Sequence, residues 1–131
     1  MCPIVSDLLA PWRPQSRIRV KALGLHWRQG RLLAAEVYGD SGNLKGVRPL
    51  GGGVDFGETW QQALRREFRE ELEIDIEIEG APQVLENIYQ HEGAIGHEVI
   101  FAAQVAFPEG AFDGQEEILF HEDNGQLRRA R

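Results

Sequence analysis

Apolar and polar positions alternate in short segments on both sides of one helical segment. Residues 17–27 alternate charged and apolar side chains, which predicts a strand with one solvated face. The Gln-Gly pair at 29–30 predicts a turn into a second strand at 32–38, its hairpin partner. Residues 44–50 are predicted to form a short extended piece that leads into a glycine turn at 51–53.

The second half of the chain repeats this alternation. Strands are predicted at 75–79, 84–90, 98–107, 117–121 and 126–131. The breaks between them are predicted at 80–82, 91–96, 109–114 and 124–125. Because 98–107 is almost continuously apolar, we expect it to be a central strand covered on both faces.

One helix is predicted in the middle of the chain. Thr59 followed three residues later by Gln62 is a capping-box pattern, so the helix is expected to start at Thr59. The apolar residues that follow recur every three or four positions and form one stripe: Trp60, Ala63, Leu64, Phe68 and Leu72. This stripe is expected to pack against the core.

Three glutamates share one flank of this helix, at the edge of the apolar stripe: Glu67, Glu70 and Glu71. Arg66 can pair with Glu70 and Arg69 with Glu73, each across one turn. Glu67 and Glu71 have no Lys or Arg three or four residues away, and they stand four residues from each other, where like charges repel. A positive charge is therefore expected beside them.

A hard divalent cation fits this position, because clustered carboxylates suit Mg²⁺ or Mn²⁺ and no Cys or His cluster is nearby to indicate zinc. The glycines at 51–53 allow the backbone to approach a ligand closely. Carboxylates beside such a loop are a usual arrangement for binding a phosphate or diphosphate through a metal. The ordinary alternative is a solvated, salt-bridged helix face.

The segment 52–74 resembles the Nudix box, G-x5-E-x7-R-E-U-x-E-E-x-G-U, in which U is an apolar residue. Gly52, Glu58 and the run Arg66-Glu67-Phe68-Arg69-Glu70-Glu71-Leu72-Glu73-Ile74 stand at its defined positions. One position departs from the pattern, since Glu73 stands where the family has glycine. That glycine ends the helix, so the change concerns the helix end more than the chemistry.

The resemblance implies an α/β (α+β) fold, a Nudix-like α/β/α sandwich with a mixed sheet and a central catalytic loop-helix-loop. It implies metal-dependent hydrolysis of the pyrophosphate bond of a nucleoside diphosphate linked to another moiety, with Mg²⁺ or Mn²⁺ as cofactor. The implied catalytic residues are Glu67, Glu70, Glu71 and Arg66. Of these, Glu70 and Glu71 would be metal ligands, Glu67 a ligand or the base, and Arg66 the residue that holds a glutamate in place.

Further residues follow from the same resemblance. The Gly52 carbonyl would be another metal ligand, and Glu58 the partner of Arg66. Members of the family often recruit one more acid after the box, and three candidates are present: Glu98, Glu116 and Glu117. Stacking on a nucleotide base could come from three aromatic residues that would otherwise be core: Trp27, Tyr89 and Phe112.

Composition narrows the class of protein. A length of 131 residues suits one domain, and we expect an irregular arm at 1–16, packed through Leu8, Leu9 and Trp12, followed by the domain at 17–131. The net charge of −7 argues against a nucleic-acid groove, and no membrane-spanning segment is visible. The single Cys fits a reducing cytoplasm. The C-terminal helix usual in the family is not expected, which would favour a homodimer.

Two other functions remain open from the sequence. A catalytically silent Nudix-like module would bind a nucleotide for regulation, but it would be expected to lose a box glutamate, and all three are present. A structural domain whose acidic helix binds a basic partner would leave the glycines unexplained. The sequence does not identify the nucleotide substrate.

Overall fold

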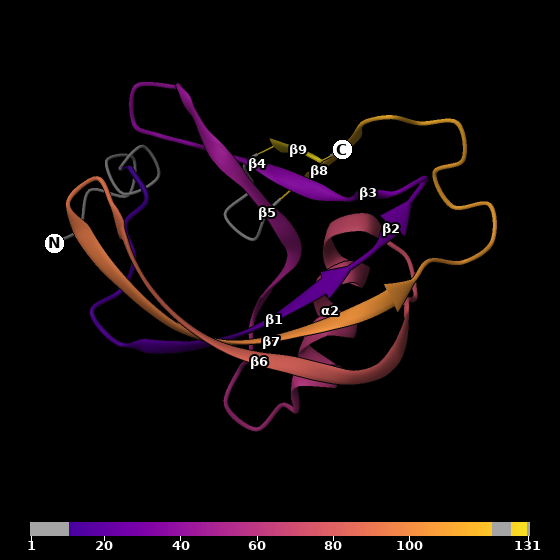
Figure 1. Cartoon of the computed structure of the whole chain (residues 1–131), viewed down its shortest axis with the longest axis horizontal. Helices are drawn as coiled ribbons and strands as arrows, with labels where there is room; N and C mark the ends of the chain where they lie inside the picture. The colour runs from indigo at the N-terminus through magenta and orange to yellow at the C-terminus, as the bar shows by residue number, and fades with distance from the viewer. Residues whose placement is uncertain (1–10, 122–126, 131) are drawn as a thin grey trace, which may run out of the picture.

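The computed structural model describes residues 11–121 and 127–130. Figure 1 shows its elements, which are β1 (Ile18–Leu25), β2 (Trp27–Arg28), β3 (Arg31–Leu32), β4 (Ala34–Tyr38), β5 (Leu44–Gly53), α2 (Trp60–Leu72), β6 (Glu77–His91), β7 (Ala94–Ala106), β8 (Ile118–His121) and β9 (Leu127–Ala130). None of the helices in the described part of the chain is long and apolar enough to cross a membrane.

The strands form a seven-stranded mixed sheet in the order β6-β7-β1-β5-β4-β9-β8, and β2 pairs with β3 in a separate hairpin. β1 lies parallel to β7 and antiparallel to β5. The sheet curls, so that β6, β7 and β1 lie on one side of α2 and β4 on the other (Figure 1). This curled mixed sheet around a helix confirms the predicted fold class.

The core lies between α2 and the curled sheet. The helix contributes Leu64 and Phe68, and the strands β1, β4, β7 and β8 contribute small or branched residues. Those strand residues are Ala22, Ala35, Ala103, Val105 and Ile118. Small residues on β1 and β7 let the helix approach closely, and a Cβ atom at Gly24 would lie only 2.7 Å from the Phe68 ring.

Several predicted strands and turns are confirmed. The Gln-Gly turn joins β2 and β3, with both residues at positive φ as a tight hairpin turn requires. β7 is a central strand, with Ile100 and Ala102 buried on one face and Ala103 and Val105 on the other. The pairing of β8 with β9 also matches the prediction, whereas its turn residues, 124–125, lie outside the described residues.

The predicted glycine turn at 51–53 is wrong, because these residues are the end of β5 and pair with β1. The predicted break at 80–82 is also wrong, since β6 continues through it with a shift in register. At 51–53 glycine lets two strands approach closely, and at 80–82 it allows the strand to bend where the register shifts. The strand expected at 32–38 as the hairpin partner of the first strand does not pair with β1, because β4 pairs with β5 and β5 pairs with β1.

The predicted solvated face of β1 is inverted near its start. Ile18 is 59% exposed, whereas the side chain of Lys21, expected in solvent, is only 23% exposed. Lys21 is covered because it forms an ion pair with Glu98 on the neighbouring strand β7, with N–O separation 2.5 Å. Residues 11–16 contain no helix or strand; the expected packing of Leu8 and Leu9 lies outside the described residues.

Candidate active site

Helix α2 begins where the capping box predicts. The Gln62 N–H donates to Thr59 Oγ1 at 3.1 Å, and the Thr59 N–H donates to Gln62 Oε1 at 2.9 Å. The preceding loop is held in the same way, since the Asp55 N–H donates to Glu58 Oε1 at 2.9 Å. Local hydrogen bonds therefore fix both the helix start and the carboxylate of Glu58.

The apolar stripe carries one glutamate into the interior. Ala63, Leu64, Phe68 and Leu72 are buried as predicted, and Glu67, which follows Ala63 by four residues, is only 3% exposed. Residues four apart lie on the same helix face, so the packing of the stripe presses Glu67 against the sheet. The carboxylate of Glu67 is therefore buried because the residue occupies a position on the apolar stripe.

The helix ends at Leu72 although glycine is missing from the next position. Glu73 adopts the left-handed conformation, with φ 57° and ψ 36°, and its N–H donates to the Arg69 carbonyl at 3.1 Å. Glu73 thus forms the cap that glycine usually forms, at some conformational cost. The predicted pair of Arg69 with Glu73 is wrong, because Arg69 donates instead to Asp75 at 2.6 and 2.9 Å.

Gly52 lies directly against the buried carboxylate. A Cβ atom at Gly52 would be 2.5 Å from the carboxyl carbon of Glu67, closer than any side chain allows. At Gly51 a Cβ atom would lie 2.1 Å from the carbonyl oxygen of Ala22 on β1. Gly51 therefore permits the pairing of two strands, and Gly52 permits the contact between a strand and the carboxylate of Glu67.

Arg66 connects the loop, the strand end and the helix. Its Nε and Nη2 donate to the two oxygens of Glu58 at 2.7 and 2.9 Å. Nη1 donates to Glu67 Oε1 at 3.0 Å and to Glu70 Oε2 at 3.4 Å, and Nη2 donates to the Gly53 carbonyl at 3.0 Å. The predicted partners Glu58 and Glu70 are confirmed, and Arg66 also places a positive charge beside Glu67, although it stands only one residue away in the sequence.

The charges of this network reinforce one another. The hydrogen bonds from Arg66, and then the Asp55 N–H, lower the pKa of the Glu58 carboxyl below its ordinary value. The same bond to Glu58 raises the pKa of the Arg66 guanidinium. Both groups are therefore ionised at neutral pH, and the paired oxygens of Glu58 lock the guanidinium in one orientation.

The three glutamates of the box are exposed to different degrees along one flank of α2. Glu67 is buried, Glu71 is half-buried and Glu70 is exposed. A single guanidinium, that of Arg66, contacts Glu58, Glu67 and Glu70. These carboxylates and the guanidinium that they share lie next to the end of β5, whose Gly53 carbonyl accepts from the same arginine.

The three candidates for an additional acid lie on two separate segments, β7 and the loop before β8. Glu98 is buried on β7 and faces away from α2, because Phe101, at the opposite parity along the strand, stacks on Trp60 of the helix. Its carboxylate is paired with Lys21. Glu116 and Glu117 are exposed in the loop before β8. The structure therefore groups Glu98 with the cations of β1.

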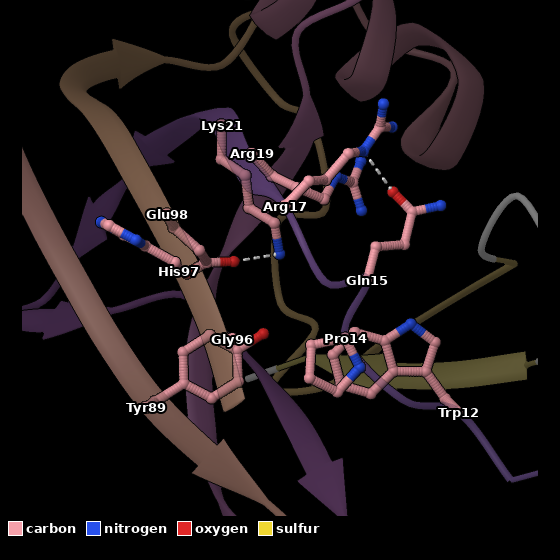
Figure 2. Close-up of a pocket in the computed structure, with 10 residues that line it drawn as sticks. All are labelled: Trp12, Pro14, Gln15, Arg17, Arg19, Lys21, Tyr89, Gly96, His97 and Glu98. Carbon is pink, nitrogen blue, oxygen red and sulfur yellow. Dashed lines mark hydrogen bonds and ion pairs between the residues drawn. The ribbon is translucent and has the colours of Figure 1, made fainter. Parts of the chain in front are cut away.

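A shallow cleft lies on the face of the sheet that Glu98 occupies (Figure 2). It is bounded by the start of β7 with its partner Tyr89 on β6, and by residues before and on β1, namely Trp12, Pro14, Gln15, Arg17, Arg19 and Lys21. Burial and the nearby charge of Glu98 raise the pKa of the Tyr89 phenol, so its hydroxyl is protonated at neutral pH. Of these residues, only Tyr89 and Glu98 were candidates from the sequence.

The other two aromatic candidates lie away from this cleft. Phe112 packs edge-on against Phe107 at the margin of the core, with ring centroids 6.1 Å apart. Trp27 is exposed on β2. The alternating charges of β1 were the only signal for the cleft in the sequence, and they do not reveal which distant segment faces that strand.

A second group of metal-type ligands is better explained as surface ion pairs. Asp40, His91 and Glu92 present ligand atoms within 4.8 Å of one another. Arg13 donates to Asp40 at 2.5 and 3.0 Å, and Lys45 donates to Glu92 at 2.9 Å. Each carboxylate is thus already neutralised by a cation on the protein surface.

Comparison with known proteins identifies the family. The model of the NUDIX domain matches residues 16–126. Among solved structures, the ORF135 protein of E. coli is similar with a TM-score of 0.57 and 24% identity, over 87% of this chain and 73% of that protein. No curated protein matches the chain.

A Nudix hydrolase from Nitrosomonas europaea is similar with a TM-score of 0.52 and 20% identity, over 72% of this chain and 64% of that protein. The chain thus spans less than two thirds of the length of that hydrolase. At these identities the likeness shows the fold, and the family model adds the membership. The chain belongs to the NUDIX domain family and is a hydrolase that acts on pyrophosphate bonds.

Proposed function

We propose that the protein is a divalent-cation-dependent hydrolase of nucleoside diphosphate derivatives. The observation that carries this proposal is the buried carboxylate of Glu67, held against the backbone of Gly52 on the helix flank that also carries Glu70 and Glu71. Burying one carboxylate beside two others is costly unless positive charge balances them, and a divalent cation would add to the charge of Arg66.

The donor set fits Mg²⁺ or Mn²⁺. Carboxylate oxygens of Glu67, Glu70 and Glu71, with the backbone carbonyl of Gly52, are the hard ligands that these ions prefer. The absence of a side chain at Gly52 lets the strand backbone lie directly against the Glu67 carboxylate. A bound cation would neutralise the diphosphate charge and lower the pKa of the attacking water.

The reaction adds water to one phosphorus of the diphosphate and breaks its bond to the bridging oxygen, which leaves with the second phosphate. The proton of the water passes to a carboxylate of the box, either Glu67 or Glu71. Arg66 acts as a positioning residue: it holds Glu67 from one side and is itself held by Glu58. These contacts keep the carboxylate oriented without reorganisation during the reaction.

The rival function is a regulatory module that binds nucleotide without turnover. The complete set of box glutamates and the intact contacts of Arg66 favour the enzyme. The third possibility, an acidic helix that binds a basic partner, does not account for the close fit between Gly52 and Glu67.

Product release from a panel of compounds tests the proposal. The panel contains nucleoside triphosphates, nucleoside diphosphate sugars, ADP-ribose, NADH and dinucleoside polyphosphates, each with Mg²⁺, Mn²⁺ or EDTA. We expect turnover of at least one compound that is lost in EDTA and restored by metal. Binding of metal or nucleotide with no turnover across the panel would instead support the regulatory module.

Two further sequence-based predictions stay predictions, namely a cytoplasmic location and a homodimer. The dimer has one supporting feature. β6 lies at the edge of the sheet, and its Ile88 is 64% exposed, which leaves an apolar side chain beside unpaired backbone groups. A dimeric mass in light scattering is expected, and a monomeric mass would contradict this prediction.

A further inference from the structure

The cleft on the face of the sheet opposite α2 is not used by the carboxylates of the box. Figure 2 shows that its side chains separate into two ends. Arg17, Arg19 and Lys21 lie together at one end, and the rings of Tyr89 and Trp12 lie at the other. In a protein with net charge −7, a row of three cations that starts just before β1 and continues along it is a local reversal of charge.

The cationic end carries more positive charge than its neighbouring carboxylate balances. Lys21 is paired with Glu98, and Arg17 donates to the neutral side chain of Gln15 at 2.7 Å. In the part of the chain that the structure describes, no carboxylate lies within ion-pair distance of Arg17 or Arg19. Arg19 is nevertheless half-buried, so its guanidinium is positioned without an anion to balance it.

The cationic end adjoins the site on the other face of the sheet. A Cβ atom at Gly53 would lie 2.6 Å from Arg19 Nη2, so this guanidinium rests on the backbone of Gly53. The carbonyl of the same residue accepts a hydrogen bond from Arg66. Arg19 and Arg66 therefore both contact Gly53, and an anion on Arg19 would lie next to the end of β5.

The other end is aromatic. Tyr89 pairs with Gly96 across β6 and β7, and its ring covers that glycine so closely that a Cβ atom there would lie 2.3 Å from the ring. Trp12 is 48% exposed and touches His91 edge-on, with ring centroids 5.2 Å apart. Trp12 is therefore accessible from solvent, whereas the Tyr89 ring is covered by Gly96 on one side and could receive a planar ligand only on the other.

We propose that this cleft binds the nucleotide part of the substrate. The base lies against Trp12 and Tyr89, and its phosphate lies on Arg19 beside Gly53, which brings the diphosphate to the glutamates of α2. The inference rests on the proposed function for the reaction, and it adds where the nucleotide binds and which residues select it. Glu98 serves this site by holding Lys21 in the row of cations.

Calorimetric titration of the full chain with the four nucleoside 5′-monophosphates tests the proposal. Ribose 5-phosphate, which lacks the base, and the free nucleosides, which lack the phosphate, serve as comparison ligands. We expect at least one nucleotide to bind about tenfold more tightly than either partial ligand. Equal affinity for ribose 5-phosphate would overturn the base site, and equal affinity for the nucleoside would overturn the phosphate site.

Matched variants locate the binding site. Arg19→Gln and Trp12→Leu are each expected to weaken nucleotide binding about tenfold with unchanged thermal stability. The controls are Arg65→Gln, an exposed arginine on the outer side of α2, and Trp27→Leu, a tryptophan that is 53% exposed. Equal losses in the test and control variants, or a loss with Arg65→Gln alone, would overturn the assignment.

The same variants separate this inference from the proposed function. With a substrate from the panel, Arg19→Gln is expected to raise KM about tenfold and to leave kcat unchanged. Metal-dependent turnover with unaltered KM in Arg19→Gln would contradict the assignment of the cleft and support the hydrolase function. Nucleotide binding that depends on Arg19 and Trp12, without turnover of any compound, would support the assignment of the cleft and contradict the hydrolase function.

Discussion

Two neighbouring glycines at the end of β5 serve opposite sides of the sheet. Gly52 faces α2 and lies against the carboxylate of Glu67, whereas Gly53 lies against the guanidinium of Arg19 on the other face. One side of the strand end is thus rich in negative charge and the other in positive charge. A metal ion suits the first and a phosphate the second, so a single strand end can adjoin both parts of a charged substrate.

The carboxylate side is expected to carry the chemistry. Glu71→Gln removes a charge from the box without removing a core contact, and we expect kcat to fall by about 10²–10⁴-fold. Glu109→Gln, at an exposed loop position, is the control and should retain full activity. The measurement is steady-state product release, and near-normal turnover by Glu71→Gln would remove this residue from the site.

The glycines offer a sharper version of the comparison. In Gly52→Ala the new methyl group must displace the end of a flexible side chain, so we expect turnover to fall about 10²-fold, with little change in stability. Gly51→Ala instead meets the backbone of β1, and we expect it to lower the free energy of unfolding by about 1–3 kcal/mol.

Steady-state kinetics and chemical denaturation of both variants measure the expected loss of turnover in Gly52→Ala and the expected loss of stability in Gly51→Ala. The reverse pattern, with Gly52→Ala unfolding and Gly51→Ala inactive but stable, would show that the two close contacts have been assigned to the wrong sides of β5.

The two sides also differ in their dependence on the core. Leu64 is fully buried between α2 and the sheet, so Leu64→Ala should lower the free energy of unfolding by about 2–5 kcal/mol. Leu44→Ala, at an exposed position at the start of β5, serves as the control and should change it by less than about 0.5 kcal/mol. Equal stabilities in urea denaturation would mean that the apolar stripe does not hold the helix.

The ion pair of Glu58 predicts how stability depends on pH. Arg66 lowers the pKa of Glu58 in the folded state below the ordinary value of 4.5. The stabilisation is therefore complete above that value, and it is lost as the pH falls through the lower folded pKa. The stability difference between the wild type and Glu58→Gln should shrink as the pH is lowered from 7 to 3 in urea titrations; a constant difference would contradict the ion-pair account.

The smallest effect is expected at the end of α2. Glu73 adopts a left-handed conformation that glycine adopts without strain, so Glu73→Gly should raise the free energy of unfolding by about 0.5–1 kcal/mol. Turnover should not change, because the hydrogen bond that Glu73 forms at the helix end goes to the Arg69 carbonyl. Within the described residues, no hydrogen bond joins Glu73 to Glu58, Arg66 or the three glutamates of the box. Thermal denaturation with an activity assay checks both, and lower stability would mean that the cap is not strained.

The α2 side could be predicted from the sequence because its interactions are local. Thr59 and Gln62 form one turn of helix, Arg66 reaches Glu58 within the same segment, and the stripe follows a helical period. The resemblance to the Nudix box also lies within this continuous stretch. Local pattern and tertiary contact therefore agree there.

The other side could not be predicted, because its residues meet only through strand pairing. Arg19 lies opposite Glu98 through the parallel pairing of β1 with β7, and Tyr89 joins them through β6. The same limit explains why a turn was wrongly predicted at Gly51. Glycine is needed there because the backbone of Ala22 on β1 lies too close for a side chain. Neither approach leaves a local signal in the sequence.

The central claim is that the carboxylate side hydrolyses and the cationic side binds. It is tested most directly by titrating a nucleoside 5′-monophosphate into Glu71→Gln and measuring the turnover of the same protein. The account predicts an affinity within about twofold of the wild type, together with a loss of turnover. An affinity that falls in step with turnover would contradict it, because nucleotide binding would then depend on the carboxylates of α2.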